Sequence, residues 1–304
     1  MTKDSTEQYP RESVLQDLSA GQIRAVVGNR LSPQDLQRSL DLVVSTFPPS
    51  VISRGINRNL NLYRFIVKSV APHLQRLHSG ATVCDLGAGA GIIPLVFAHR
   101  GFLVNVVDKW DEYSPDFNNQ MGITEDFLRR FEQFSVHAYD CDLMLSKTPL
   151  PDGSQDLVSA YSVLEHFPRP HLLMNEIYRL LKPRGLAVIL IPNVASLQSR
   201  LRHMFGATPH LDPWHNFYRS DFGGHYRELT LKELESVAKE WNLEPLTLLR
   251  SEASRINTPL SDGHWVAGWR IRPSCIQFAR GLYLVVVQLF PSLRFDLLLI
   301  AQKI

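Results

Sequence analysis

The residues best suited to chemistry form a glycine-rich turn after an apolar run. The run from Ala81 to Leu86 has the composition of a buried strand, and Asp85, Gly87, Gly89 and Gly91 mark its end and the turn that follows. Glycine permits a positive φ and, because it lacks a Cβ, lets a ligand approach the backbone closely. A helical run comes next, so its N-terminal N–H groups face the same place. The pattern predicts a cofactor pocket.

A carboxylate at the end of the next apolar run supports this interpretation. The run from Phe102 to Val107 ends at Asp108, where a carboxylate can accept two hydrogen bonds from a ribose diol. A dinucleotide fingerprint requires Gly-x-Gly-x-x-Gly, whereas the third glycine here, Gly91, comes one residue early. The spacing therefore disfavours NAD.

The pattern Asp-x-Gly-x-Gly-x-Gly from Asp85 to Gly91 resembles the first motif of the class I S-adenosylmethionine-dependent methyltransferases, and Asp108 falls where that family keeps its ribose-binding acid. The resemblance continues in order through the turn Pro151-Asp152-Gly153, the segment Ser162-Val163-Leu164-Glu165-His166-Phe167, and a helix and glycine turn that precede a fifth strand at 186–191. It covers about 81–193 and implies S-adenosyl-L-methionine (SAM) as the cofactor.

The resemblance also implies which residues contact the cofactor. In the family an acid after the third strand holds the adenine amino group, and either Asp140 or Asp142 can fill that role. The expected cofactor-binding residues lie in turns and at strand ends; they are Asp85, Gly87, Ala88, Gly89, Gly91, Asp108, Lys109, Asp140, Cys141, Asp142, Ser162, Val163 and His166.

The alternation of short apolar strands with helix-length segments is typical of a parallel sheet buried on both faces. We expect an α/β fold with a doubly wound, mostly parallel, seven-stranded sheet of the Rossmann-like methyltransferase type. The carboxyl ends of its parallel strands then meet at one edge, where ligands bind. Residues 1–78 are predicted to form an N-terminal helical extension or cap, and 79–304 the SAM-binding domain, with 195–230 as a substrate lid insertion.

Several elements are predicted from local signals. Helices are expected to begin after Ser32, with a capping box, and after Thr124 and Thr230. Pro72 is expected to kink or break a second N-terminal helix. The apolar tail from 276 to 304 predicts a helix followed by the last, antiparallel strand.

The predicted lid is rich in histidine and aromatic residues, and we expect His215, Tyr218, His225 and Tyr226 to bind substrate. If the acceptor is a hydroxyl, a general base must take its proton, and a histidine suits that task. His166 and His225 are the candidates. The alternative roles are that His166 only shapes the pocket and that His225 only packs against the following helix. No histidine pair has a helical i, i+4 spacing, so no metal site is predicted.

Composition restricts the partners. The net charge of +2, with mixed signs, disfavours nucleic acid as a partner. Three cysteines without a C-x-x-C pair fit a reducing compartment, and the polar N-terminus lacks a secretory pattern, so a cytoplasmic location is expected. Arg280, Arg294 and Asp296 interrupt the apolar tail, which argues against a transmembrane segment and leaves peripheral membrane contact open. The sequence leaves the oligomeric state open.

Together these patterns predict a methyltransferase that acts on a hydroxyl of a small molecule or glycan by in-line displacement. The alternatives are N- or C-methylation of a small metabolite, or a SAM-binding scaffold without turnover. RNA or protein methylation is disfavoured, because Ser162-Val163-Leu164-Glu165 stands where an Asn/Asp-Pro-Pro-Tyr/Phe tetrapeptide would be expected.

Overall fold

The computed structural model describes residues 31–78, 80–110, 127–207, 225–256, 265–266, 269–270 and 273–304. Its main sheet consists of β1 (Thr82–Leu86), β2 (Leu103–Asp108), β3 (His137–Asp140), β4 (Gln155–Tyr161), β5 (Leu181–Pro192), β6 (Leu243–Ser251) and β9 (Asp296–Lys303). The seven strands are ordered β3-β2-β1-β4-β5-β9-β6. The pairs from β3 to β5 are parallel, and β9 runs antiparallel to both of its neighbours. This confirms the predicted fold class and the antiparallel last strand.

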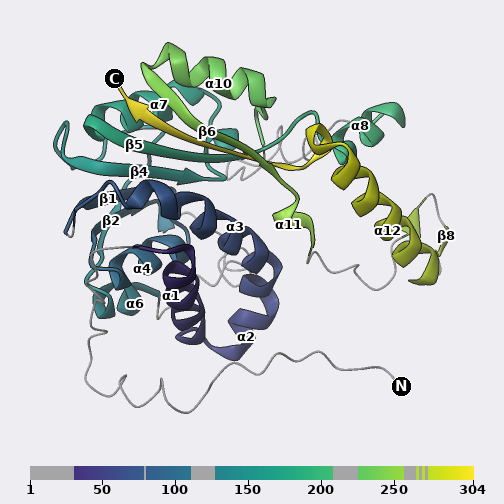
Figure 1. Ribbon diagram of the computed structural model, residues 1–304, viewed down its shortest axis with the longest axis horizontal. Helices are drawn as coiled ribbons and strands as arrows, with labels where there is room; N and C mark the ends of the chain where they lie inside the picture. The colour runs from purple at the N-terminus through teal and green to yellow at the C-terminus, as the bar shows by residue number, and fades with distance from the viewer. Residues whose placement is uncertain are drawn as a thin grey trace.

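The helices cover both faces of the sheet (Figure 1). The described ones are α1 (Pro33–Ser45), α2 (Pro49–Val51), α3 (Asn57–Leu74), α4 (Ile92–His99), α6 (Phe127–Gln133), α7 (Pro170–Leu180), α8 (Leu197–Met204), α10 (Leu231–Glu240), α11 (Ala253–Ile256) and α12 (Pro273–Leu289). Short π or 3-10 turns are η2 (Ile52–Ile56), η4 (Leu164–His166) and η5 (Pro291–Leu293), and a small hairpin pairs β7 (Trp265–Val266) with β8 (Trp269–Arg270).

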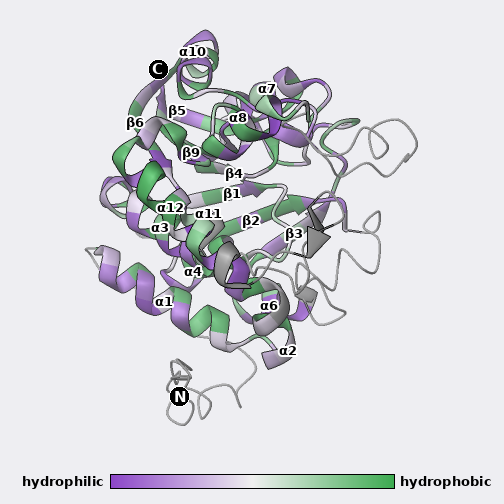
Figure 2. Ribbon diagram, turned by 90° about the vertical axis from the view of Figure 1, so that its right-hand side faces the viewer, coloured by the Kyte–Doolittle hydropathy of each residue, from purple (hydrophilic) through white to green (hydrophobic). Residues whose placement is uncertain are grey.

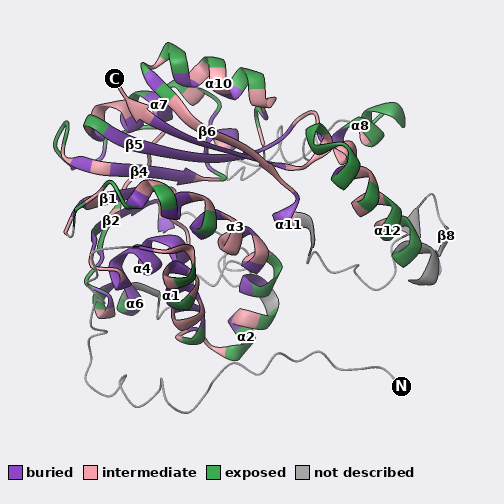
Figure 3. Cartoon of the chain, viewed as in Figure 1, coloured by how far each residue is buried: buried purple, intermediate pink, exposed green. Residues whose placement is uncertain are grey.

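Two apolar cores lie on opposite faces of the sheet. Along β5, Val188 and Leu190 belong to the core shared with α1, α3 and α4, whereas Ile189 and Ile191 belong to the core shared with α7 and α10. This alternation follows from the two-residue period of a strand. The strands β4 and β5 are largely buried (Figure 3), and α1 alternates between hydrophilic and hydrophobic residues along its length (Figure 2).

The predicted helix starts are confirmed where the structure describes them. The Ser32 hydroxyl accepts from the Asp35 N–H at 3.1 Å, and Asp35 in turn accepts from the Ser32 N–H, which completes a capping box at α1. Thr230 and Glu233 form the same arrangement at α10. The expected N-cap Thr124 lies outside the described residues. None of the described helices is long and apolar enough to cross a bilayer.

Pro72 does not break the second N-terminal helix, because α3 continues through it and ends at Leu74. One local prediction differs from the structure. The strand β5 begins at Leu181, directly after α7, rather than at Leu186. Arg184, with φ of 66°, forms an irregularity within the strand where a glycine turn was predicted, and Leu181 already pairs with Gln155 of β4.

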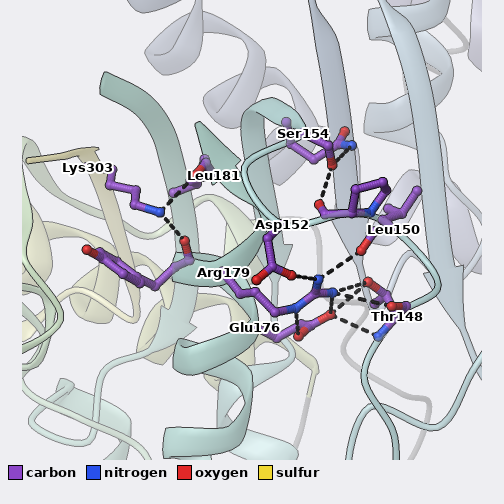
Figure 4. Close-up of polar contacts among 11 residues, drawn as sticks. Thr148, Leu150, Asp152, Ser154, Glu176, Arg179, Leu181 and Lys303 are labelled. Atoms are coloured by element: carbon purple, nitrogen blue, oxygen red, sulfur yellow. Dashed lines mark hydrogen bonds and ion pairs between the residues drawn. The ribbon is translucent and has the colours of Figure 1, made fainter. Parts of the chain in front are cut away.

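A charged cluster fastens α7 to the segment that leads into β4 (Figure 4). The Arg179 guanidinium donates from Nε and Nη2 to both carboxylate oxygens of Glu176, at 2.8 and 2.6 Å. It also donates to the Leu150 carbonyl at 2.8 Å. Thr148 donates to Glu176 from its N–H and its hydroxyl, at 2.9 and 2.7 Å. The cluster holds α7 against the sheet and thereby supports η4 just before it.

Candidate cofactor and acceptor site

The glycine turn and Asp108 lie side by side at the carboxyl ends of β1 and β2. In the parallel register of the two strands, Leu86 pairs with Val107. The Asp108 carboxylate accepts the Gly89 N–H at 2.6 Å and the Lys109 N–H at 2.8 Å, and the N–H groups of Gly87 and Ala88 donate to the Val107 carbonyl. The predicted glycine residues and ribose-binding acid therefore belong to one structure.

The three glycines are required for different structural reasons. All adopt a positive φ, of 73° at Gly87, 52° at Gly89 and 68° at Gly91. A Cβ on Gly87 would come within 2.5 Å of Val163, and one on Gly91 would overlap the Phe131 ring. A Cβ on Gly89 would meet nothing within 4 Å. Gly89 is thus the glycine at which a ligand has room to approach the backbone.

Asp85 lies beneath this turn, where burial raises its pKa to about 8 despite a hydrogen bond from Ser159. Only 3% of the residue is exposed, and the Ser159 hydroxyl donates to its carboxyl group at 2.5 Å. The charge of Asp108 raises the pKa further. Burial and the charge of Asp108 thus favour the neutral form of the Asp85 carboxyl group.

The two candidate acids after β3 have different surroundings. Asp140 pairs with Asp108 in the strand register, and its residue is exposed. The Asp142 side chain is 19% exposed, lies 3.5 Å from the Lys109 ammonium, and accepts the Met144 N–H at 2.7 Å. Cys141 lies between them, and its N–H donates to the Asp108 carbonyl at 2.8 Å. Lys109, Cys141 and Asp142 thus adjoin Asp108.

The segment after β4 forms the other side of the site. Ser162 adopts a φ of 56°, and its N–H donates to the Leu190 carbonyl at 2.8 Å, so the chain turns sharply at the strand end. The Val163 side chain then lies so close to Gly87 that a Cβ on this glycine would overlap it. Burial raises the pKa of the Glu165 carboxyl to about 8, and the nearby charge of Glu228 adds to that effect.

His166 and His225 meet in this part of the site. Their ring centroids are 5.0 Å apart, with an interplanar angle of 80°. Nδ1 of His225 lies 2.7 Å from a carboxylate oxygen of Glu228. The N–H groups of Tyr226 and Arg227 donate to the Glu165 carbonyl, at 2.7 and 3.3 Å. The described end of the predicted lid, from His225 onward, is therefore docked on η4, which follows β4.

Sequence reasoning named both histidines but not their contact, and it assigned no role to Glu165 or Glu228. The one local signal was the position of Glu165 beside His166 in a segment that already resembled methyltransferases. The predicted substrate residues His215 and Tyr218 lie outside the described residues. Tyr226 is described and is 42% exposed.

Comparisons with known proteins agree with this geometry. A family model described as a methyltransferase domain matches residues 57–248, which is more than half of the chain. An uncharacterized methyltransferase of Mycobacterium sp. strain JLS is 34% identical over 112 residues, which are 36% of this chain and 38% of that protein. A ubiquinone biosynthesis O-methyltransferase of Paraburkholderia xenovorans strain LB400 is 27% identical over 156 residues, 50% of this chain and 60% of that protein.

Solved structures are similar at low identity. Phosphoethanolamine N-methyltransferase 2 of Haemonchus contortus, in complex with SAM, has a TM-score of 0.49 and 16% identity over 81% of this chain and 52% of that one. A SAM-dependent methyltransferase of Archaeoglobus fulgidus has a TM-score of 0.47 and 19% identity over 79% of this chain and 94% of that one. On the match of the family model, the chain belongs to the methyltransferase domain family.

Proposed function

We propose that this methyltransferase transfers the methyl group of SAM to a hydroxyl of a small molecule or glycan. On the donor side, the open approach at Gly89 and the Asp108 carboxylate support a nucleoside bound across the ends of β1 and β2. Asp142 is the better candidate for the adenine amino group, because it lies beside Lys109, whereas Asp140 is exposed.

The observation that carries the acceptor proposal is the cluster of Glu165, His166 and His225 next to the donor turn. Val163, which occupies the space above Gly87, precedes this cluster by two residues, so titratable groups lie close to where the methyl group would be presented. A hydroxyl is a weak nucleophile and has to lose its proton in the reaction, which requires such groups. The match to a ubiquinone biosynthesis O-methyltransferase over half of this chain is consistent with a hydroxyl acceptor.

The reaction is an in-line displacement. The acceptor oxygen forms a bond to the methyl carbon, the bond from that carbon to sulfur breaks, and its electron pair stays on sulfur, which becomes a neutral thioether. The hydroxyl proton leaves on the side of the histidine cluster. The protein's task is to align oxygen, carbon and sulfur and to exclude water.

The test is methyl transfer from isotopically labelled SAM to a panel of phenols, catechols, sugars and amines, with products identified by mass spectrometry. We expect the label on a hydroxyl oxygen, and a loss of about 100-fold in kcat on His225→Ala. His171→Ala, which changes an exposed histidine of α7, serves as the control and should keep full activity. Label on nitrogen or carbon would show that the acceptor atom is not a hydroxyl oxygen. SAM binding without any methyl transfer would favour a scaffold without turnover.

Peripheral contact with a membrane and the cytoplasmic location remain predictions. The contact is supported by α12, which projects away from the sheet (Figure 1) and exposes Phe278, Leu282, Val285 and Leu289 at helical spacing. The helix contains Arg280 and no acidic residue, so the partner proposed is an anionic lipid surface. Cosedimentation with anionic vesicles, lost on Leu282→Asp, is the expected result, and unchanged sedimentation of that variant would contradict it.

A further inference from the structure

Three possible metal ligands lie together on the acceptor side of the site. Glu165, His166 and His225 each offer a ligand atom, and these atoms all lie within 4.8 Å of one another. Around a zinc ion with bonds of about 2.1 Å, neighbouring ligand atoms are roughly 3.4 Å apart. Side-chain movements that displace the ligand atoms by about 1 Å would therefore suffice for all three to bind one ion.

Glu165 supplies a second, independent observation. Its residue is only 1% exposed, and its Oε2 is buried without a hydrogen-bond partner. Burying a carboxylate oxygen without a partner costs free energy, and in native structures such a group calls for an explanation. A cation bound to this oxygen would remove the cost.

A carboxylate partner orients the His225 ring. Its Nδ1 lies 2.7 Å from Glu228 Oε1, which leaves Nε2 as the nitrogen available to an ion. Histidines that bind metals generally direct their other ring nitrogen at a carboxylate or carbonyl, because this sets the tautomer and the ring orientation. Glu228 is itself 8% exposed, so the pair is largely shielded from water.

The backbone connects the two halves of the cluster. Tyr226 and Arg227 donate to the carbonyl of Glu165, which fixes His225 next to His166 although the two are far apart in the sequence. The cluster therefore depends on tertiary structure, and the helical spacing that was sought in the sequence would not reveal it.

We propose that Glu165, His166 and His225 bind a divalent transition-metal ion whose open coordination positions receive the acceptor hydroxyl. Two imidazoles and one carboxylate suit zinc, manganese or iron(II) better than magnesium or calcium, which prefer oxygen ligands alone. The inference rests on the proposed methyl transfer and names what activates its acceptor. It also replaces the general-base role of His225 by that of a ligand, with Glu228 as a positioning residue.

The chemistry of the step stays balanced. A divalent ion lowers the pKa of a hydroxyl bound to it, so the hydroxyl proton passes to solvent. The acceptor oxygen then forms its bond to the methyl carbon as the carbon–sulfur bond breaks. The ion is neither oxidised nor reduced, and no further reactant is needed.

The test is a calorimetric titration of the full chain with Zn²⁺, after removal of metal by a chelator. We expect one ion per chain in the wild type. Glu165→Gln and His225→Ala should each weaken binding by about 100-fold or more, and Glu228→Gln by about 10-fold to 100-fold. His171→Ala is the matched control and should bind like the wild type. Equal binding by all variants, or equal loss in the control, would overturn the proposal.

A second measurement uses only the wild type and therefore tests the site even if the variants fail to fold. Co²⁺ added to the metal-free wild type should give the visible absorption of an ion with nitrogen and oxygen ligands, and equimolar Zn²⁺ should abolish it. Absence of that spectrum would overturn the proposal.

Measurements of methyl transfer distinguish failure of the metal site from failure of the proposed function. Methyl transfer to a hydroxyl by protein free of metal, at the rate of the metal-loaded protein, would refute the metal site and leave the proposed function standing. Specific binding of one ion, with methyl transfer to nitrogen or carbon only, would support the metal site and refute the hydroxyl acceptor.

Discussion

Removing the Arg179 side chain should destabilise the fold strongly. The guanidinium is 14% exposed and the Glu176 side chain 8% exposed, so Arg179→Met leaves a buried carboxylate whose remaining partners are the two groups of Thr148. Breaking a buried ion pair costs about 3–5 kcal/mol. The Thr148 bonds reduce this cost, and the loss of the bond to the Leu150 carbonyl adds about 1 kcal/mol. The ion pair with Asp152, whose side chain is 81% exposed, adds little. We expect a decrease of about 3–4 kcal/mol in the free energy of unfolding.

The assay is urea unfolding followed by circular dichroism, for Arg179→Met, Glu176→Gln and the double variant. Because the cost comes from the unpaired partner, the double variant should be more stable than the sum of the single effects predicts, by about 2 kcal/mol. Arg169→Met, on an exposed arginine just before α7, is the control. Burial opposes ionisation of Glu176, but the bonds from Arg179 and Thr148 outweigh it and lower its pKa below 4.5. The stabilisation by the ion pair should therefore persist above that pH and decrease as the pH falls further. A loss below about 1 kcal/mol for Arg179→Met, or strictly additive effects, would show that the buried Glu176 carboxylate does not depend on Arg179.

Two further predictions concern the turn at the donor side. The pKa of Asp85 is about 8 in the folded protein against an ordinary 3.8, so between these values the folded state holds a proton that the unfolded state lacks, and stability falls as pH rises. Glu165, whose pKa is also raised to about 8, adds a similar dependence, so from pH 6 to 8 Asp85→Asn should lose about 2 kcal/mol less than the wild type in urea unfolding without SAM; equal losses in both would contradict the raised pKa of Asp85. Gly91→Ala should lower stability by about 2–4 kcal/mol, through backbone strain and overlap with Phe131, whereas Gly89→Ala should cost only about 1 kcal/mol and chiefly weaken SAM binding. Thermal melts and SAM titrations of both variants check this, and the same stability loss in each would contradict the distinction.

The sequence predicted those parts of the site that depend on local order. The glycines and Asp108 were identified because a strand, a turn and a second strand follow one another directly, and parallel strands bring their carboxyl ends to one edge. The capping boxes at Ser32 and Thr230 were confirmed for the same reason, since all their partners lie within one turn of a helix.

The remaining features depend on contacts between distant segments. The contact of His166 with His225 and the burial of Glu165 require the end of the predicted lid to dock on η4, which no local pattern encodes. The start of β5 was misplaced because Pro183 and Gly185 resemble a turn. The chain does depart from extended geometry there, at Arg184, but Leu181 pairs with Gln155 before this irregularity, so the strand begins earlier.

The most direct test of the donor site is a calorimetric titration of the full chain with SAM and, separately, with NAD. We expect one SAM per chain and no NAD binding. Asp108→Ala should weaken SAM binding by about 100-fold, since two hydrogen bonds to a charged group contribute about 3 kcal/mol or more. Glu240→Ala, at an exposed acid of α10, should bind as the wild type does. Preference for NAD, absence of SAM binding, or undiminished affinity of Asp108→Ala would contradict the assignment of the donor site.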